Sequence, residues 1–572
     1  MNINQYPNKM NRIFPWVGLS LFLFFLSNLA MAATIDQDSN TGAMKKDFPE
    51  YVQERPAPLN TPHAAPPAPT ISAPASMSIT VDGIEFSGNT AFSETRLQAE
   101  AASFLGRVLD EADIEELRYR LTRLYVDQGY INSGAVLEGH DENTRHLRFR
   151  LVEGRLKETQ VKASPGLDPD YVARRLQLAG GPPFHLPTLQ ERFLLLLEDP
   201  LIESLHGDLL PGTTPGEAIL QAGATERRRY GFGLTLDNHG PVSLGEGRAL
   251  LTGTYRNFTG RGETTSFGYD LGDGNRRGRA DFNIPISARD TRFHADFERG
   301  RAQVVEKPAN ILDINSDYTA YEIGVTHPFI QHLKDSLVLG LSIGGRSNST
   351  RLLGRPFSLT QGSVNGRVKV APERFTQEWI ARDVDRMYAL RSAISVGTRA
   401  LGATDIHTGP TDTKFVTWVL QQRYSRQWLN NRLQFIGRLD MQFADSPLPV
   451  LEQLGIGGAD TVRGYRENVL IRDQALLASL EARYGLLENE TQVRYGKLDG
   501  AVFADFARGW NKGAGADSAA DYLYSAGLGL IWSWRDKLRA ELYWGHALKD
   551  PPQKTGGTWQ DSGVHLQLRA TY

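Results

Sequence analysis

The feature that most constrains this sequence is a long run of short alternating segments that follows Arg227. Apolar side chains alternate with small or polar ones in residues 265–271, and the pattern recurs at 280–286, 293–298, 321–325, 337–343 and 433–443. A period of two is typical of a β-strand with one apolar and one polar face. Because helical periodicity nearly vanishes here, residues 227–572 are predicted to be almost wholly β.

Strands of this kind occur in two architectures. A soluble sandwich hides the apolar faces inside, whereas a membrane barrel turns them toward lipid and keeps a polar lumen. The last segment favours the barrel, because Val564, Leu566, Leu568 and Ala570 alternate with polar residues up to the aromatic Tyr572. Since a membrane-spanning strand needs about 9–11 residues, the region has room for roughly sixteen strands.

The first 32 residues have the composition of a secretory signal peptide. Lys9 and Arg12 precede an apolar stretch from Ile13 to Leu29, and Ala30-Met31-Ala32 supplies the small residues that a signal peptidase reads. Cleavage is expected after residue 32, with an uncleaved membrane anchor as the alternative. The absence of cysteine excludes disulfides and thiolate metal sites, and a net charge of −3 gives no indication of nucleic-acid binding.

Two small α+β modules are predicted between this segment and the barrel. Residues 33–77 are polar and then proline-rich, a composition that cannot bury a core. In residues 78–156, a strand with Ile84 and Phe86 precedes two helices, the second starting at Asp110, and a strand with Leu147, Phe149 and Leu151.

The second module is predicted in residues 157–226. Pro187 suits the first position of a helix whose apolar face includes Leu189 and Phe193, and Asp199-Pro200 ends that helix. Residues 209–212 and 215–216 are predicted to be turns before a last strand at Ile219 and Leu220.

Short motifs in a fixed order carry a resemblance to a known family. The first module contains Ile84-Glu-Phe-Ser-Gly-Asn89, Tyr125-Val-Asp-Gln-Gly-Tyr130 and Leu151-Val-Glu-Gly154, and the second contains Leu210-Pro-Gly212 and Pro215-Gly216. Leu236-Asp-Asn-His-Gly240 opens the barrel, and Gly457-Gly458-Ala-Asp-Thr-Val-Arg-Gly-Tyr465 follows within it. In these motifs the sequence resembles the TpsB family, the transporters of two-partner secretion, within the superfamily of outer-membrane assembly factors. The resemblance implies two POTRA domains in front of a barrel.

The resemblance also assigns candidate site residues. The POTRA signature falls on Gly88, Asn89, Tyr125, Gly129, Tyr130, Pro211 and Gly212. Val462, Arg463, Gly464 and Tyr465 correspond to the tip of a long loop that folds back into the barrel. The barrel-wall motif is Phe503-Ala-Asp-Phe-Ala-Arg-Gly509, in which Ala507 replaces an expected glycine, so that local packing is expected to differ. Residues 33–54 are the place for the family's plug helix, whose presence stays open.

Arg463 and Asp505 are the predicted anchor of this loop. Arginine presents a planar, permanently charged fork that matches a carboxylate. Asp505 shares one strand face with Ala501 and Phe503, and the opposite face, with Val502, is predicted to meet lipid. The alternative is a solvated charge pair that contributes about 0–1 kcal/mol.

The resemblance implies a translocation pore that binds an unfolded exoprotein through periplasmic POTRA domains and secretes it to the surface of a Gram-negative cell. Expected partners are a large exoprotein (an adhesin, a cytolysin or a haem or iron scavenger), outer-membrane lipid and the barrel-assembly machinery. The alternatives are an insertase of the same superfamily, a passive porin and a barrel esterase.

Catalytic interpretations have weak support in the sequence. Gly340-Leu-Ser-Ile-Gly344 matches a nucleophile elbow, but its serine lies inside an alternating segment and not at a strand-to-helix turn. The histidines show no metal-ligand spacing, and residues 455–458 lack the setting of a phosphate-binding loop. No enzymatic activity, metal or cofactor is expected.

Overall fold

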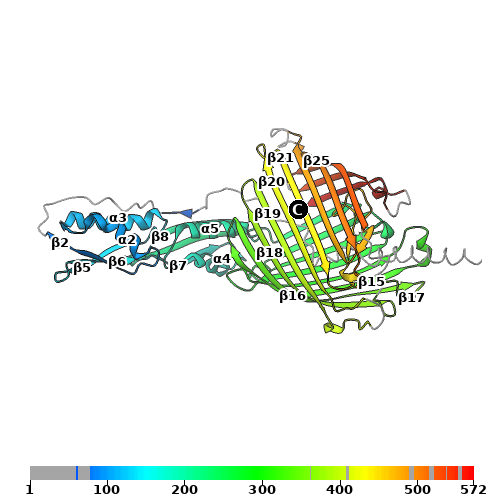
Figure 1. The fold of residues 1–572 in the computed structure, drawn as a ribbon, viewed down its shortest axis with the longest axis horizontal. Helices are drawn as coiled ribbons and strands as arrows, with labels where there is room; N and C mark the ends of the chain where they lie inside the picture. Colours follow the sequence, from blue (N-terminus) through cyan, green and yellow to red (C-terminus); the bar gives the residue numbers. More distant parts are fainter. Residues whose placement is uncertain are drawn as a thin grey trace, which may run out of the picture.

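The computed structural model describes residues 59–61, 78–360, 362–406, 411–487, 495–513, 521–535, 537–551 and 557–572. The predicted signal peptide, the segment 33–54 and most of the proline-rich linker lie outside these residues. Two small α+β modules extend from one end of a wide β-barrel, which gives the chain an elongated shape (Figure 1).

The first module packs two helices against a small sheet. As predicted, α3 begins after Asp110, whose carboxylate accepts a hydrogen bond from the Asp113 N–H at 2.8 Å. The α3 face with Leu117, Leu121 and Tyr125 is fully buried, so burial of this apolar stripe fixes the helix on the sheet. The elements are β2 (Ile79–Val81), β3 (Gly83–Ser87), α2 (Glu94–Ala101), β4 (Arg107–Leu109), α3 (Glu111–Asp127), β5 (Gly134–Asp141) and β6 (His146–Val152), with sheet order β3-β6-β5 and a separate β2-β4 pair.

The second module is a four-stranded sheet covered by two helices. Leu189 and Phe193 of α5 are fully buried in its core, as their spacing predicts. The sheet order is β1-β8-β9-β7, in which β1 (Leu59–Asn60) comes from the linker. The other elements are β7 (Arg155–Ala163), α4 (Pro169–Leu176), α5 (Leu186–Glu198), β8 (Ile202–Pro211) and β9 (Glu217–Glu226).

Two local predictions in this module are wrong. Residues 209–211 do not form a turn, because they continue β8, in which Leu205, Gly207 and Leu209 alternate toward the core. Pro211 is tolerated as the last residue of the strand, and the turn occupies residues 212–216. Pro187 is the second residue of α5, where a missing N–H also costs no intrahelical hydrogen bond.

Sixteen strands form a closed antiparallel barrel within the described residues, which confirms the predicted strand number. The two-residue β17 (Arg355–Pro356) only extends the end of β16. The barrel closes where β10 pairs with β28. Its strands are β10 (Tyr230–Asp237), β11 (Arg248–Arg256), β12 (Thr264–Gly272), β13 (Asn275–Pro285), β14 (Arg292–Gln303), β15 (Asn315–Gln331), β16 (Asp335–Leu352), β18 (Arg367–Arg382), β19 (Arg386–Thr398), β20 (Val416–Trp428), β21 (Leu433–Ala444), β24 (Gln474–Gly485), β25 (Lys497–Trp510), β26 (Asp521–Trp534), β27 (Leu538–Ala547) and β28 (Val564–Thr571).

The apolar faces of these strands point outward. In β12, Phe267 and Tyr269 are 57% and 45% exposed, whereas Asp270, the residue after Tyr269, is buried. The last strand repeats the pattern, with Leu568 exposed and His565 buried inside. An outward apolar face is the arrangement of a membrane barrel and not of a soluble sandwich. Among the described residues, no helix combines the length and apolarity needed to cross a bilayer.

The second module contacts the barrel turns at one end. The Asn257 side chain donates to the Gly166 carbonyl at 2.9 Å, and Arg192 Nη1 donates to Gln331 Oε1 at 2.8 Å. The family resemblance implies that the POTRA domains are periplasmic. The barrel end that contacts the second module therefore faces the periplasm, and the opposite end, near β17, faces the cell exterior (Figure 1).

Candidate functional site: a loop anchored inside the barrel

The segment between β21 and β24 folds into the barrel and crosses its lumen. It contains a short helical turn (Val450–Glu452) and a hairpin formed by β22 (Leu454–Ile456) and β23 (Leu470–Arg472). Its tip includes Val462, Arg463, Gly464 and Tyr465, all of them buried, as the resemblance implies for a loop inside the barrel. We call residues 445–473 the lumen loop.

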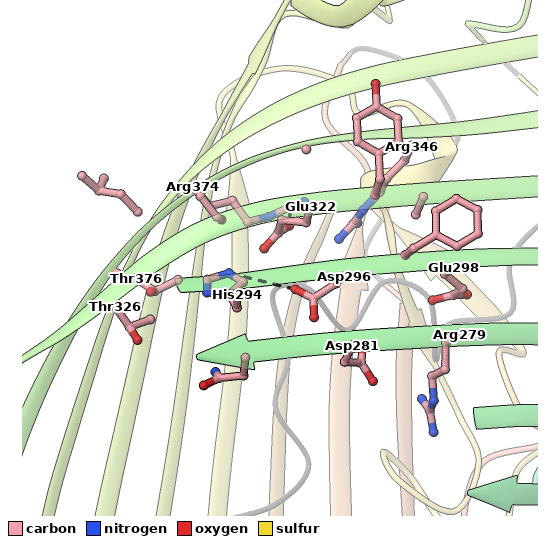
Figure 2. Close-up of a pocket in the computed structure, with 18 of the residues that line it drawn as sticks. Arg279, Asp281, His294, Asp296, Glu298, Glu322, Thr326, Arg346, Arg374 and Thr376 are labelled. Atoms are coloured by element: carbon pink, nitrogen blue, oxygen red, sulfur yellow. Dashed lines mark hydrogen bonds and ion pairs between the residues drawn. The ribbon is translucent and has the colours of Figure 1, made fainter. Parts of the chain in front are cut away.

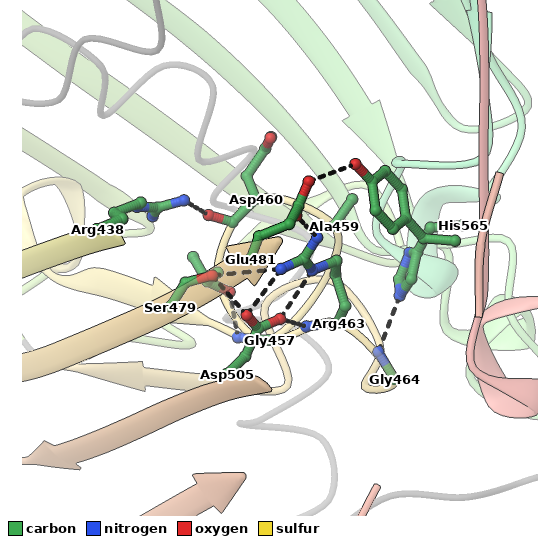
Figure 3. Close-up of polar contacts among 12 residues, drawn as sticks. Arg438, Gly457, Ala459, Asp460, Arg463, Gly464, Ser479, Glu481, Asp505 and His565 are labelled. Atoms are coloured by element: carbon green, nitrogen blue, oxygen red, sulfur yellow. Dashed lines mark hydrogen bonds and ion pairs between the residues drawn. The ribbon is translucent and has the colours of Figure 1, made fainter. Parts of the chain in front are cut away.

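Arg463 binds Asp505 of β25 through two guanidinium nitrogens. Nε donates to Oδ2 at 2.8 Å and Nη2 donates to Oδ1 at 2.9 Å, while the Arg463 backbone N–H donates to Oδ2 at 3.0 Å (Figure 3). The two side chains are buried, with residue exposures of 7% and 3%. The structure therefore brings together the predicted pair in a bidentate geometry, and not as a solvated charge pair.

The wall around Arg463 completes its environment. Glu481 of β24 forms a second ion pair with Nη1, and the Ser479 hydroxyl donates to Asp505 Oδ1 at 2.7 Å. The guanidinium carbon lies 3.6 Å from the centre of the Phe503 ring, which is the predicted partner on the wall. Arginine satisfies this site because it offers several donors in a plane and a flat face for the aromatic ring.

Gly464 and Tyr465 attach the tip to the last strands of the barrel. The Gly464 N–H donates to His565 Nε2 at 3.2 Å, and the backbone φ of Gly464 is 93°, a left-handed value that favours glycine (Figure 3). The Tyr465 hydroxyl lies 2.9 Å from the Lys549 carbonyl oxygen. Val462, Tyr465 and Ala507 belong to one apolar cluster, so the alanine that replaces the expected glycine packs directly beneath the loop.

Sequence reasoning missed two further anchors of the lumen loop. Arg466 Nη1 donates to Glu306 at 2.9 Å and its Nη2 donates to Asp561 at 2.8 Å. On the opposite wall, Glu452 pairs with Arg346 of β16 at 3.3 Å and with Arg374 of β18 at 3.2 Å. The loop is thus tied to both sides of the barrel. For Arg466, the one indication in the sequence was its position directly after the family motif. Nothing in the sequence indicated that Glu452 anchors the loop.

A charged cavity of about 490 Å³ lies in the lumen beside Arg374 (Figure 2). His294 and Asp296 of β14 and Glu322 of β15 offer atoms within 4.8 Å of one another, a cluster that the sequence spacing does not indicate. Arg374 Nη1 donates to Glu322 at 2.7 Å, and Arg279 and Arg346 also line the cavity. The protein's own guanidinium groups therefore balance these carboxylates.

The POTRA signature residues are mainly structural. Gly88 and Gly129 have φ values of 76° and 87°. The Asn89 side chain donates to the Phe92 carbonyl at 3.0 Å, and the Tyr125 ring lies 5.9 Å from that of Tyr130. The Gly129 carbonyl accepts the Leu186 N–H at 3.0 Å, which links the two modules, and the Gly212 N–H donates to the Glu217 carbonyl at 2.8 Å, next to Pro211.

Glu153 is the polar centre of the first module. It accepts hydrogen bonds from the Ala91 N–H at 2.7 Å, the Thr90 N–H at 2.6 Å and the Tyr125 hydroxyl at 3.0 Å. Partial burial raises the pKa of Glu153, but these hydrogen bonds outweigh burial and leave its pKa below the ordinary value. Burial beside this carboxylate also raises the pKa of Tyr125.

Ser342 lies inside β16, so the sharp strand-to-helix turn of a nucleophile elbow does not occur at residues 340–344.

A closed barrel with an apolar exterior, two α+β modules at one mouth and a loop anchored in the lumen define the class as outer-membrane β-barrel transporters. A family model described as haemolysin secretion/activation protein ShlB/FhaC/HecB matches residues 216–531, and one described as POTRA domain, ShlB-type, matches residues 79–154. The chain belongs to the ShlB/FhaC/HecB family of haemolysin secretion/activation proteins, the TpsB transporters of two-partner secretion in the outer membrane.

Relatives and solved structures agree with this assignment. The chain is 22% identical to the outer membrane transporter CdiB of Dickeya dadantii over 406 residues, which cover 68% of this chain and 69% of that protein. It is 22% identical over 196 residues to the heme/hemopexin transporter protein HuxB of Haemophilus influenzae, covering 33% of this chain and 34% of HuxB. The structure of CdiB from Escherichia coli superposes with a TM-score of 0.68 at 17% identity, covering 97% of this chain and 98% of that one. The structure of BamA from Haemophilus ducreyi superposes with a TM-score of 0.52 at 13% identity, covering 87% of this chain and 100% of that one, so the barrel fold extends beyond the secretion family. The match to the secretion family model favours secretion over the insertase alternative.

Proposed function

We propose that this transporter captures one large unfolded exoprotein in the periplasm, conducts it through the barrel lumen and releases it at the cell surface. The observation that carries the proposal is the lumen loop, which is bound to both walls of a barrel whose polar face is turned inward. Such a loop is positioned to respond to a polypeptide that enters the same space. The corresponding division of the chain is a signal peptide (1–32), a linker segment (33–77), two POTRA domains (78–156 and 157–226) and the barrel (227–572).

The sheet edges of the POTRA domains are the proposed capture sites. An extended segment can add to an exposed strand through backbone hydrogen bonds, which give affinity without strict sequence requirements. The pairing of Leu59 and Asn60 with Gly207 and Asp208 along β8 supports this proposal, since it is strand addition by an extended segment.

The sequence shows no nucleotide-binding motif, so we propose that transport draws its energy from a source other than nucleotide hydrolysis by this chain. An exoprotein that folds irreversibly outside the cell biases movement outward, because the folded part cannot re-enter the pore. An exoprotein that cannot fold would then be secreted slowly; secretion at the normal rate would contradict this mechanism. We propose no enzymatic activity for the chain.

The proposed passenger is an adhesin, a cytolysin or a haem or iron scavenger, the last in keeping with the name of HuxB. Insertion of the transporter itself is assigned to the barrel-assembly machinery. Deletion of the gene tests the central proposal: loss of one large protein from the culture supernatant supports secretion, whereas a general loss of outer-membrane proteins supports the insertase alternative.

The role of the lumen loop is tested by expressing the Arg463→Ala variant in the deletion strain. We expect secretion to fall while the barrel remains inserted, as judged by heat-dependent gel mobility. Arg508→Ala is the matched control, because Arg508 is an exposed arginine on the outer face of the same strand as Asp505. Normal secretion by Arg463→Ala, or an equal loss in the control, would defeat the assignment.

A further inference from the structure

Four arginines form a cluster on the outer surface of the barrel, at the end far from the POTRA domains. Arg276 and Arg301 are direct cross-strand partners on β13 and β14, and Arg299 lies two residues from Arg301 on the same face. Arg351 of β16 joins them through Asp317. All four arginines are exposed, and their outward direction follows from the register, which aligns Arg276 with the lipid-facing Leu271.

The direction of the strands places the arginine cluster along the barrel axis. The turn before β12 contacts the second POTRA domain, where the Asn257 side chain donates to the Gly166 carbonyl. β12 therefore runs away from the periplasm, and Arg276, which follows the next turn, lies at the external end. Toward the membrane centre, the same outer face carries Tyr269, Phe297 and Tyr321, which are 45%, 50% and 39% exposed. Aromatic residues at this level are typical of the interface between hydrocarbon and head groups.

The surface between these arginines is hollow. A cavity of about 600 Å³ is lined by three of these arginines (Arg276, Arg299 and Arg301), by Tyr269, and by two carboxylates, Asp273 and Asp317. Gly278 also lines it, and its missing side chain leaves room beside Tyr269 on the outer face. The outer surface is therefore concave at this level of the barrel.

The charges in the cavity are incompletely balanced. Asp317 is shared, because its two oxygens lie 3.0 Å from Arg301 Nε and 3.0 Å from Arg351 Nη1. Arg276 and Arg299 have no ion-pair partner among the described residues. Like charges directly opposite each other on neighbouring strands are unfavourable, so a bound anion would relieve the repulsion between Arg276 and Arg301.

We infer that this cavity binds a phosphate of a phosphorylated glycolipid in the outer leaflet. The guanidinium group suits phosphate oxygens because its donors lie in a rigid planar fork. Basic pockets at the interface of membrane proteins bind anionic head groups in the same way. The acyl chains of such a lipid would lie along the apolar face below, over Phe297 and its neighbours, while the sugar and phosphate occupy the basic cavity.

The test uses the purified full-length protein in detergent with lipid A as the probe. Native mass spectrometry measures the bound fraction of bisphosphorylated lipid A, monophosphoryl lipid A and phosphatidylethanolamine, and a parallel titration adds inorganic phosphate as competitor. We expect preferential binding of bisphosphorylated lipid A, with weak competition by inorganic phosphate. Each of Arg276→Ala and Arg299→Ala should lower the affinity roughly tenfold, as expected for loss of a charge-assisted contact.

Arg508→Ala is the matched control, because Arg508 is also exposed, faces outward at the external end of β25 and lies near aromatic rings, but outside the cluster. Heat-dependent gel mobility establishes that every variant is a folded barrel. Equal affinity for lipid A and phosphatidylethanolamine, equal loss in the control, or displacement by inorganic phosphate at the affinity of lipid A would each overturn the inference. Binding of an acidic peptide in preference to lipid A would overturn it as well.

Discussion

Gly464 of the lumen loop and Gly545 of β27 lie so close together that neither position has room for a side chain. A Cβ atom on Gly464 would lie 2.8 Å from the carbonyl carbon and oxygen of Gly545, and a Cβ on Gly545 would lie 2.6 Å from the Gly464 nitrogen. The tip of the loop therefore rests backbone against backbone on the barrel wall, and the adjacent Arg463 reaches Asp505 from that position.

Gly545→Ala should lift the tip from the wall. The backbone of Gly545 is extended within β27, so alanine suits the strand, and the added Cβ would clash with the backbone of Arg463 and Gly464 at the loop tip. We expect more frequent open events in planar-bilayer recordings, because the anchored state is selectively destabilised. Gly437→Ala is the control, since a Cβ there would meet its nearest atom at an ordinary 3.7 Å. Identical channel records for Gly545→Ala and wild type would show that this contact does not hold the loop.

Arg463→Lys should fail to replace arginine. Lysine has no planar fork, so it cannot contact both oxygens of Asp505 and Glu481 at once. Leaving one of these buried carboxylates without its partner costs about 3–5 kcal/mol. The tip of the lumen loop is therefore expected to detach from the barrel wall. Exoprotein in the culture supernatant, measured by immunoblot, should fall to nearly the level of Arg463→Ala. Secretion by the lysine variant at the wild-type level would mean that charge alone suffices.

Glu452→Ala should release the other side of the lumen loop. Arg346 and Arg374 would lose their carboxylate partner in the loop, although Arg374 keeps Glu322. We expect increased hydrogen exchange at backbone amides near residues 450–456, with the tip around Arg463 less affected. Uniform protection of both parts of the loop, equal to wild type, would contradict two separate anchors.

Glu153→Gln should destabilise the POTRA pair in a pH-dependent way. Because the folded pKa of Glu153 is below its ordinary value of 4.5, its ionised form stabilises the fold fully above that value, and the contribution is lost as the pH falls through the lower folded pKa. At pH 7 the variant should lose about 1–2 kcal/mol of unfolding free energy. Thermal unfolding of a fragment spanning residues 78–226 measures this, with a difference that shrinks toward pH 3. A difference independent of pH would assign the effect to packing.

The sequence allowed prediction of features that depend on neighbours in the chain. The apolar alternation at residues 265–271 predicted the strand, the alternating segment that ends at Tyr572 favoured a lipid-facing barrel over a sandwich, and Asp110 predicted the start of α3. Asp505 was placed on the lumen face by the same alternation, while its pairing with Arg463 came from the family resemblance. These signals are local or depend on a shared motif.

Other features depend on register between distant strands. Glu452 meets Arg346 and Arg374 only because the lumen loop crosses the barrel, and no spacing in the sequence encodes that crossing. The arginine cluster likewise needs Arg276 and Arg301 to be cross-strand partners. In β8, the turn residues Pro211 and Gly212 suggested an early turn at Leu209, but alternation toward the core extended the strand through Pro211.

Passage of the exoprotein through the lumen is the central claim, and neighbouring residues of β14 test it directly. The Glu298 side chain lies on the lumen face of β14, whereas the Phe297 side chain is 50% exposed on the outer face. A photo-crosslinking amino acid at each position therefore differs only in the side of the wall that it samples. During secretion in cells, we predict exoprotein adducts at position 298 and none at position 297. Equal adducts at both positions, or none at 298 while secretion proceeds, would contradict the account.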